Sequence, residues 1–106
     1  MPGEPLYLRI HDAENRIWRV DISGGLNVGT VHNANPIFPG RWQWSITARP
    51  VRRGAATSGT AETREQATAE FRSAWDLAGV DIEAWRRHMA DVARAAAAWE
   101  AHKRGG

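Results

Sequence analysis

The chain of 106 residues contains no cysteine and lacks any long apolar run. The missing thiol excludes disulfides, a thiolate nucleophile and a cysteine-ligated zinc ion. The longest apolar run, AAAAW at 95–99, is far shorter than a membrane-spanning helix. The opening residues, MPGEPLYLRIHD, show no basic stretch followed by an apolar one, so they do not resemble a signal peptide. We therefore expect a cytoplasmic protein with no membrane contact.

Acidic residues are missing from residues 22–61, although the chain has 12 of them elsewhere. This interval carries four arginines, which makes it +4, whereas ten basic and twelve acidic residues make the remainder −2. Such asymmetry can mark a surface that docks an acidic partner. The candidate anion or nucleic-acid contacts are Arg41, Arg49, Arg52 and Arg53. The alternative is a solvated strand edge and loop that keeps the protein soluble.

Arginines in the predicted helices have acidic neighbours at helical spacing. Glu83 precedes Arg87 by four residues, and Asp91 precedes Arg94 by three. Pairs at these spacings can neutralise each other. The strand and loop arginines have no such neighbour and are the ones available to a ligand.

The sequence offers no support for catalysis. The four histidines, at positions 11, 32, 88 and 102, include no helical pair with the spacing of zinc ligands. The loop GAATSGT (54–60) lacks the Gly-Lys-Ser/Thr ending of a phosphate-binding loop. No nucleophile has a recognisable base beside it. We expect neither an enzyme nor a bound cofactor or metal ion.

Alternating and helical patterns cover most of the chain, which is long enough for one domain, 1–106. Alternation predicts strands at 6–10, 17–22, 26–32 and 41–49, separated by turns and a loop at 33–40. Residues 51–61 read as a flexible basic loop. Capping signals and apolar stripes predict helices at about 63–78 and 81–103. The expected fold is α+β: an antiparallel meander of three to four strands over about 5–50, with two C-terminal helices packed on one face (ββββαα).

The stretch RWQWSITARPVRRG (41–54) contains the most regular predicted strand. Trp42, Trp44, Ile46 and Ala48 share one face. We expect the two tryptophans to meet Trp18 and Trp75, from a neighbouring strand and a helix, in a tryptophan-rich core. In the alternative, the indoles lie exposed as a stacking platform for bases. That alternative requires a sheet face that the helices leave uncovered.

The second predicted helix has an apolar stripe over its whole length. The stripe residues are Ile82, Trp85, Met89, Val92, Ala96 and Trp99, at spacings of three and four. Its second half, RAAAAWEAHK, is rich in alanine, which lets another helix approach closely. We therefore expect a homo-oligomer, with Val92, Ala96 and Trp99 as the candidate dimer contacts.

The run from GRWQWSITARP to SGTAETREQATAEFRSAWDLAG resembles small uncharacterised bacterial proteins of the alphaproteobacterial type. Those proteins pair a W-x-W strand with a capped helix, and the resemblance implies no known activity. The same run is similar to antitoxin domains of the HicB type and to double-stranded-RNA-binding domains. The second of these families opens its helix with adjacent lysines, whereas residues 64–66 here contain one basic residue. Neither resemblance transfers a functional residue.

Together these patterns favour a small non-enzymatic binding module that acts through protein–protein contacts as a homodimer. The alternative is a nucleic-acid-binding protein that uses the acid-free segment 41–53.

Overall fold

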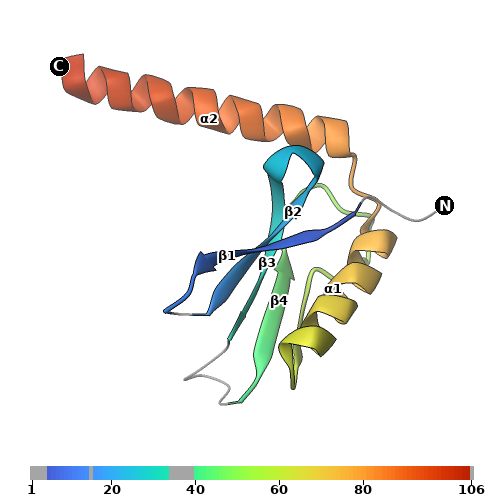
Figure 1. The fold of residues 1–106 in the computed structure, drawn as a ribbon. Coiled ribbons are helices and arrows are strands. Elements are labelled where there is room, and N and C mark those ends of the chain that lie inside the picture. The colour runs from blue at the N-terminus through green and yellow to red at the C-terminus, as the bar shows by residue number, and fades with distance from the viewer. Residues whose placement is uncertain (1–4, 15, 34–39, 106) are drawn as a thin grey trace.

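The computed structural model describes residues 5–14, 16–33 and 40–105, and these form an α+β domain (Figure 1). Within these residues, a five-stranded antiparallel sheet is followed by two helices, and the strands lie in the sheet in chain order. The elements are β1 (Tyr7–Asp12), β2 (Ile17–Ile22), the 3₁₀ turn η1 (Ser23–Gly25), β3 (Leu26–Asn33), β4 (Trp42–Ile46), β5 (Ser58–Ala61), α1 (Arg64–Ala78) and α2 (Ile82–Gly105). The predicted meander with two C-terminal helices is confirmed. The predicted loop at 33–40 lies mostly outside the described residues.

The fifth strand corrects the prediction of three to four strands. β5 lies inside the segment 51–61, which its small residues, SGTA, made look like a loop. It forms by pairing antiparallel with the edge of β4, where Gly59 is the partner of Trp44. A β-carbon at Gly59 would lie 2.7 Å from the indole Nε1 of Trp44, so a glycine there leaves room for the ring. Pairing with a neighbour, and not an apolar pattern of its own, makes this segment a strand.

Helix α1 matches its prediction at both ends. The Thr63 side chain accepts a hydrogen bond from the Gln66 backbone N–H at 3.0 Å, and Gly79 ends the helix in the left-handed conformation at φ 63°. Its buried residues are Ala67, Phe71, Ala74, Trp75 and Ala78. This face packs on β3, β4 and β5. The ring of Phe71 meets Trp44 edge to face, with centroids 6.1 Å apart.

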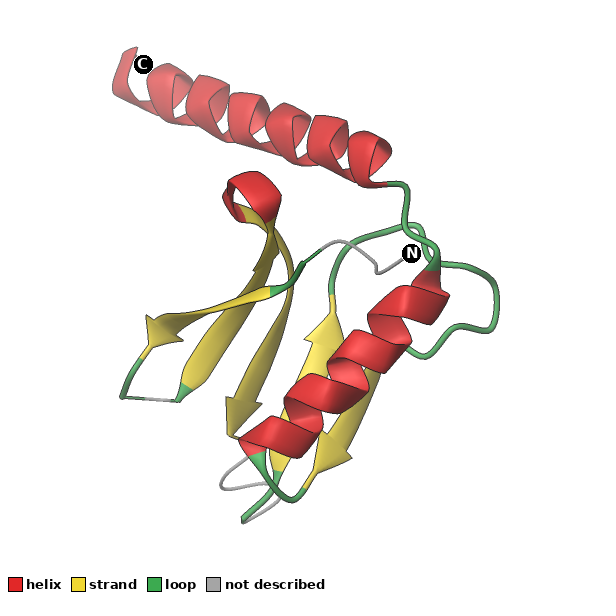
Figure 2. Cartoon of the chain, turned by 45° about the vertical axis from the view of Figure 1, so that its right-hand side comes forward, coloured by secondary structure: helices red, strands yellow, loops and turns green. Residues whose placement is uncertain are grey.

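Helix α2 departs from the prediction that both helices cover one face of the sheet. It begins just after α1 ends, with the Asp81 side chain accepting from the Ala84 N–H at 3.0 Å. It then passes over the end of the sheet beside η1 and extends away from the domain (Figures 1 and 2). Its first turns hold it there, because the indole N–H of Trp85 donates to the Asn27 carbonyl at 2.9 Å. Only α1 therefore covers the sheet face.

The opposite face of the sheet holds a buried carboxylate. Asp21 is 1% exposed, and it accepts from Arg19 at 2.9 Å and pairs with Arg9 at 3.3 Å. The side-chain amide of Asn27 lies 3.3 Å from the same carboxylate. Asp21 is therefore buried with its charge compensated.

Candidate functional site

Helix α1 packs on β3, β4 and β5. The same sheet face is open at Ile10 of β1 and Trp18 of β2, whereas Val20, further along β2, is buried. A cross-strand row on this face runs through Ile10, Trp18, Val31 and Trp44. Val31 and Trp44 are buried, whereas Trp18 is half-buried and Ile10 is 60% exposed. The row thus leaves the core as it passes from β4 towards β1.

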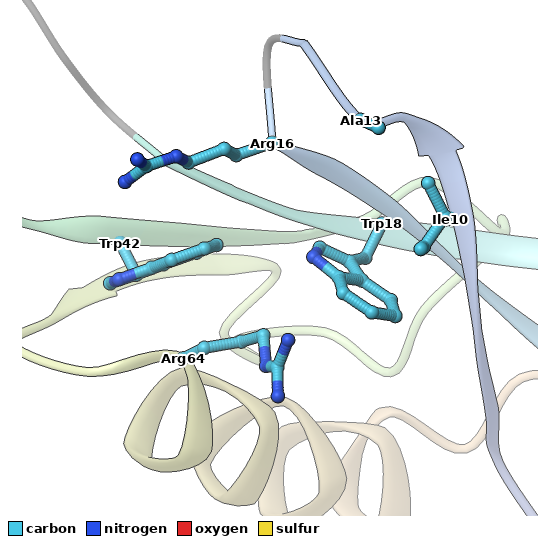
Figure 3. Close-up of a pocket in the computed structure, with 6 residues that line it drawn as sticks. All are labelled: Ile10, Ala13, Arg16, Trp18, Trp42 and Arg64. Atoms are coloured by element: carbon cyan, nitrogen blue, oxygen red, sulfur yellow. The ribbon is translucent and has the colours of Figure 1, made fainter.

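A pocket of about 310 Å³ lies at this open end of the face. The described residues that line it, called here the tryptophan pocket, are Ile10, Ala13, Arg16, Trp18, Trp42 and Arg64 (Figure 3). They come from β1, the turn after it, β2, β4 and the first residue of α1. The pocket brings two indoles and two guanidinium groups together, and none of these lining residues is acidic.

The two arginines of the pocket are held differently. The guanidinium of Arg64 lies over the Trp18 ring, 4.5 Å from its centroid, which is a cation–π contact. Its ion pair with Glu65 is long, at 3.6 Å, and that side chain is 78% exposed. Arg16 follows a tight turn and has a left-handed backbone, at φ 54°. Within the described part of the chain, its side chain makes no ion pair.

The pocket corrects the prediction that four tryptophans meet in the core. Trp44 and Trp75 are buried, at 4% and 6% exposure, as expected. Trp18 and Trp42 are only half-buried and line the tryptophan pocket. The prediction failed because strand alternation gives the face on which a side chain lies but not how far a helix covers that face. Sequence reasoning also missed Arg16 and Arg64, for which no local pattern indicated a shared site.

The structure does not bring the four arginines of the acid-free segment together. Arg41 precedes β4 and Arg49 follows it, so a strand of about 16 Å separates them. The Arg49 guanidinium donates hydrogen bonds to the backbone carbonyls of Ile46 at 2.6 Å and of Ala48 at 2.9 Å. Arg52 lies against Gly79, whereas Arg53 is exposed.

The second half of α2 does not pack its apolar stripe on the rest of the described domain. Residues 90–103, called here the arm, are exposed at every position. Val92 is 46% exposed and Trp99 is 62% exposed, and Ala96 between them is also exposed. All three candidate dimer contacts are thus available to a partner. The arm spans about 20 Å.

The described residues show no further chemical centre. In the ranges that the structure covers, no three His, Asp or Glu side chains gather closely enough to hold a metal ion. His88 and His102 each stack on a tryptophan of α2, Trp85 and Trp99 respectively. Neither α1 nor the described part of α2 has the length and apolar content that crossing a bilayer would require.

Comparison with known proteins gives no assignment. No family model matches the chain, and neither a curated protein nor a solved structure does. The resemblance to small bacterial proteins with a W-x-W strand therefore stays a prediction, and function has to be inferred from the site itself.

Proposed function

We propose that the protein is a small non-enzymatic binding module that acts through protein contacts, and that its arm pairs with the arm of a second copy. One observation carries the proposal. The apolar stripe of α2 packs on the domain as far as Met89 and then continues, uncovered, through Val92 and Trp99. A large exposed indole at the end of such a stripe is typical of an interaction surface.

The composition of the arm favours a second helix as the covering element. Ala93 and Ala95 neighbour Ala96, so small side chains surround this part of the stripe. Small side chains let helix axes approach to about 8 Å. The ion pair between Asp91 and Arg94 is formed within the arm itself, so pairing need not bury an isolated charge.

The order of charges along the arm favours a second copy in antiparallel orientation. Asp91, Arg94, Glu100 and Lys103 alternate in sign and are spaced symmetrically about Ala97. An antiparallel pair with its two-fold axis at Ala97 sets Asp91 of each copy level with Lys103 of the other, whereas Arg94 lies on the side of the arm away from the stripe. A parallel pair sets like charges level with one another. The antiparallel order also aligns the helix dipoles favourably.

The same register, to within one residue, sets Ala96 of one arm beside Trp99 of the other. Both indoles then pack over alanine, and the two-fold symmetry makes the two contacts equivalent. Two arms of this length bury less than the 1,200–2,000 Å² or so of a standard interface. We therefore expect a weak dimer, with a dissociation constant in the micromolar range.

Sedimentation velocity over a concentration series tests the proposal. The parent protein should form a dimer at micromolar concentration, and Trp99→Glu should return it to monomer by placing a charge in the interface. Ala101→Glu is the matched control, because it adds the same charge on the opposite side of the arm and should leave the dimer intact. A parent that stays monomeric at about 100 micromolar would overturn the proposal.

A further inference from the structure

We infer that the tryptophan pocket binds a nucleotide, with the base stacked on an indole and the phosphate held by guanidinium groups. The nucleotide is either free or part of a single strand, since both present the same chemistry. This site is separate from the arm, and it includes Trp42 of the acid-free segment 41–53 but none of that segment's four arginines.

The first support is the form of the pocket. Its volume of about 310 Å³ is at the lower end of the range for small-molecule sites, about 300–1,000 Å³. Trp18 and Trp42 present flat apolar surfaces to it, and Ile10 adds an aliphatic contact. Flat, half-buried indoles at an open sheet face match a base, because every base has a π-face that can stack.

The second support is charge. Arg16 and Arg64 give the pocket two positive charges, and its described lining has no carboxylate. The acid nearest to Arg64 in sequence, Glu65, is a distant and exposed partner. Both guanidinium groups can therefore turn to an anion without breaking a buried ion pair. Arginine also binds phosphate with paired N–H donors.

The contacts within the pocket divide the roles of the two indoles. Trp18 is already covered by the guanidinium of Arg64, which it orients. Figure 3 shows Trp42 between the side chains of Arg16 and Arg64. We assign the base to Trp42 and the phosphate to the two arginines, with Trp18 as a positioning residue for Arg64.

A nucleotide uses every part of this lining. An aliphatic carboxylate would engage the guanidinium groups alone, and a neutral aromatic compound would engage the indoles alone. Bases inside a duplex are stacked on one another and do not offer a face to a protein ring. A single strand or a free nucleotide does.

Binding of AMP by calorimetry, and of a short labelled single-stranded RNA by fluorescence anisotropy, tests the inference. AMP should bind more tightly than adenosine, which lacks the phosphate, and than ribose 5-phosphate, which lacks the base. If AMP displaces the RNA, the ligand is a free nucleotide that shares the pocket with the strand. If the RNA binds well and AMP displaces it poorly, the source is a single strand.

Variants place the binding in the pocket. Trp42→Ala should lower affinity by about tenfold or more, and Trp42→Phe should retain most of it, because a phenyl ring still stacks. Replacing both Arg16 and Arg64 by glutamine should weaken binding. It should also flatten the log–log salt dependence for the RNA, from a slope of up to about −1.4 towards zero. Trp18→Ala should weaken phosphate binding only while Arg64 is present.

The matched control removes two charges elsewhere. Arg41→Gln combined with Arg53→Gln changes the net charge equally at exposed positions outside the pocket, and affinity should not change. If Trp42→Ala fails to fold in a thermal melt, the arginine variants and the comparison of AMP with ribose 5-phosphate decide. The inference is overturned if neither AMP nor RNA binds at about 50 mM salt. It is equally overturned if AMP binds no better than ribose 5-phosphate, or if a folded Trp42→Ala protein binds as the parent does.

Discussion

The ring of Phe71 in α1 lies directly over Gly29 in β3. A β-carbon at Gly29 would lie 2.5 Å from Cε2 of Phe71 and 2.2 Å from the carbonyl oxygen of Ser45. Helix α1 is seated on the sheet through this close approach, so the glycine determines how deeply the helix lies. The position of α1, in turn, decides which part of the sheet face stays open.

Gly29→Ala should therefore destabilise the protein by about 1–3 kcal/mol, the range for overpacking a well-packed core. Urea unfolding followed by circular dichroism measures the change. Thr30→Ala is the control, since Thr30 is next along β3 and points to the other face of the sheet. Equal stability of the Gly29→Ala protein and the parent would show that α1 lies further from the sheet than described.

The two tryptophans of β4 should differ in their effect on stability. Trp44 is 4% exposed and donates from Nε1 to Glu70 at 3.2 Å, whereas Trp42 is half-buried in the pocket wall. Trp44→Ala should cost about 3–5 kcal/mol, the range for emptying a large aromatic site. Trp42→Ala should cost clearly less. Thermal melts of both variants test the order, and a reversed order would mean that the core covers Trp42 more fully than Trp44.

Substitutions of the arginines on either side of Pro50 should also differ in their effect on stability. Arg49 donates two hydrogen bonds to backbone carbonyls, so Arg49→Gln should lower stability by about 1–2 kcal/mol. Arg53 is exposed, and Arg53→Gln should change stability by less than about 0.5 kcal/mol. Chemical unfolding of the two variants measures the difference. If Arg49→Gln is as stable as the parent, Arg49 is free to contact a ligand after all.

Asp21 gives a further test of the sheet's second face. Its carboxylate is buried between Arg9 and Arg19, so Asp21→Ala removes charge-assisted hydrogen bonds that solvent does not replace. The expected loss is about 2 kcal/mol. Arg9→Ala should cost less, because that side chain is 63% exposed. An Asp21→Ala protein no less stable than Arg9→Ala would show that the carboxylate is solvated.

Periodicity predicted the elements whose structure depends on residues close to them in the sequence. The alternation at Trp44 and Ile46 and the capping of α1 by Thr63 were predicted, because each depends on residues within a few positions. Strand β5 was missed because it depends on pairing with β4, and its residues carry no apolar pattern.

The pocket was missed for a related reason. The stripe of α2 gave no sign that its first turns, at Trp85 and Met89, pack at the end of the sheet and not on its face (Figure 1). With α2 placed over the sheet, Trp18 had to be in the core. The short connection between α1 and α2 decides which part of the sheet face the helices cover, and the sequence of that connection has no periodic pattern. Arg16 and Arg64 could be joined in one site only after the helices were placed.

The central claim, that two arms pair in antiparallel orientation, can be measured as a distance between spin labels. The chain has no cysteine, so Ala90→Cys and Ala97→Cys each introduce one labelling site, and the two sites are seven residues apart on the same side of the arm. In an antiparallel dimer the two labels at position 97 lie at the same level along the helix axis, while those at position 90 are separated by a further 20 Å or so along it. Pulsed electron paramagnetic resonance should therefore give a clearly longer distance at position 90 than at position 97. Equal distances at the two positions, or no dipolar coupling at either, would contradict the claim.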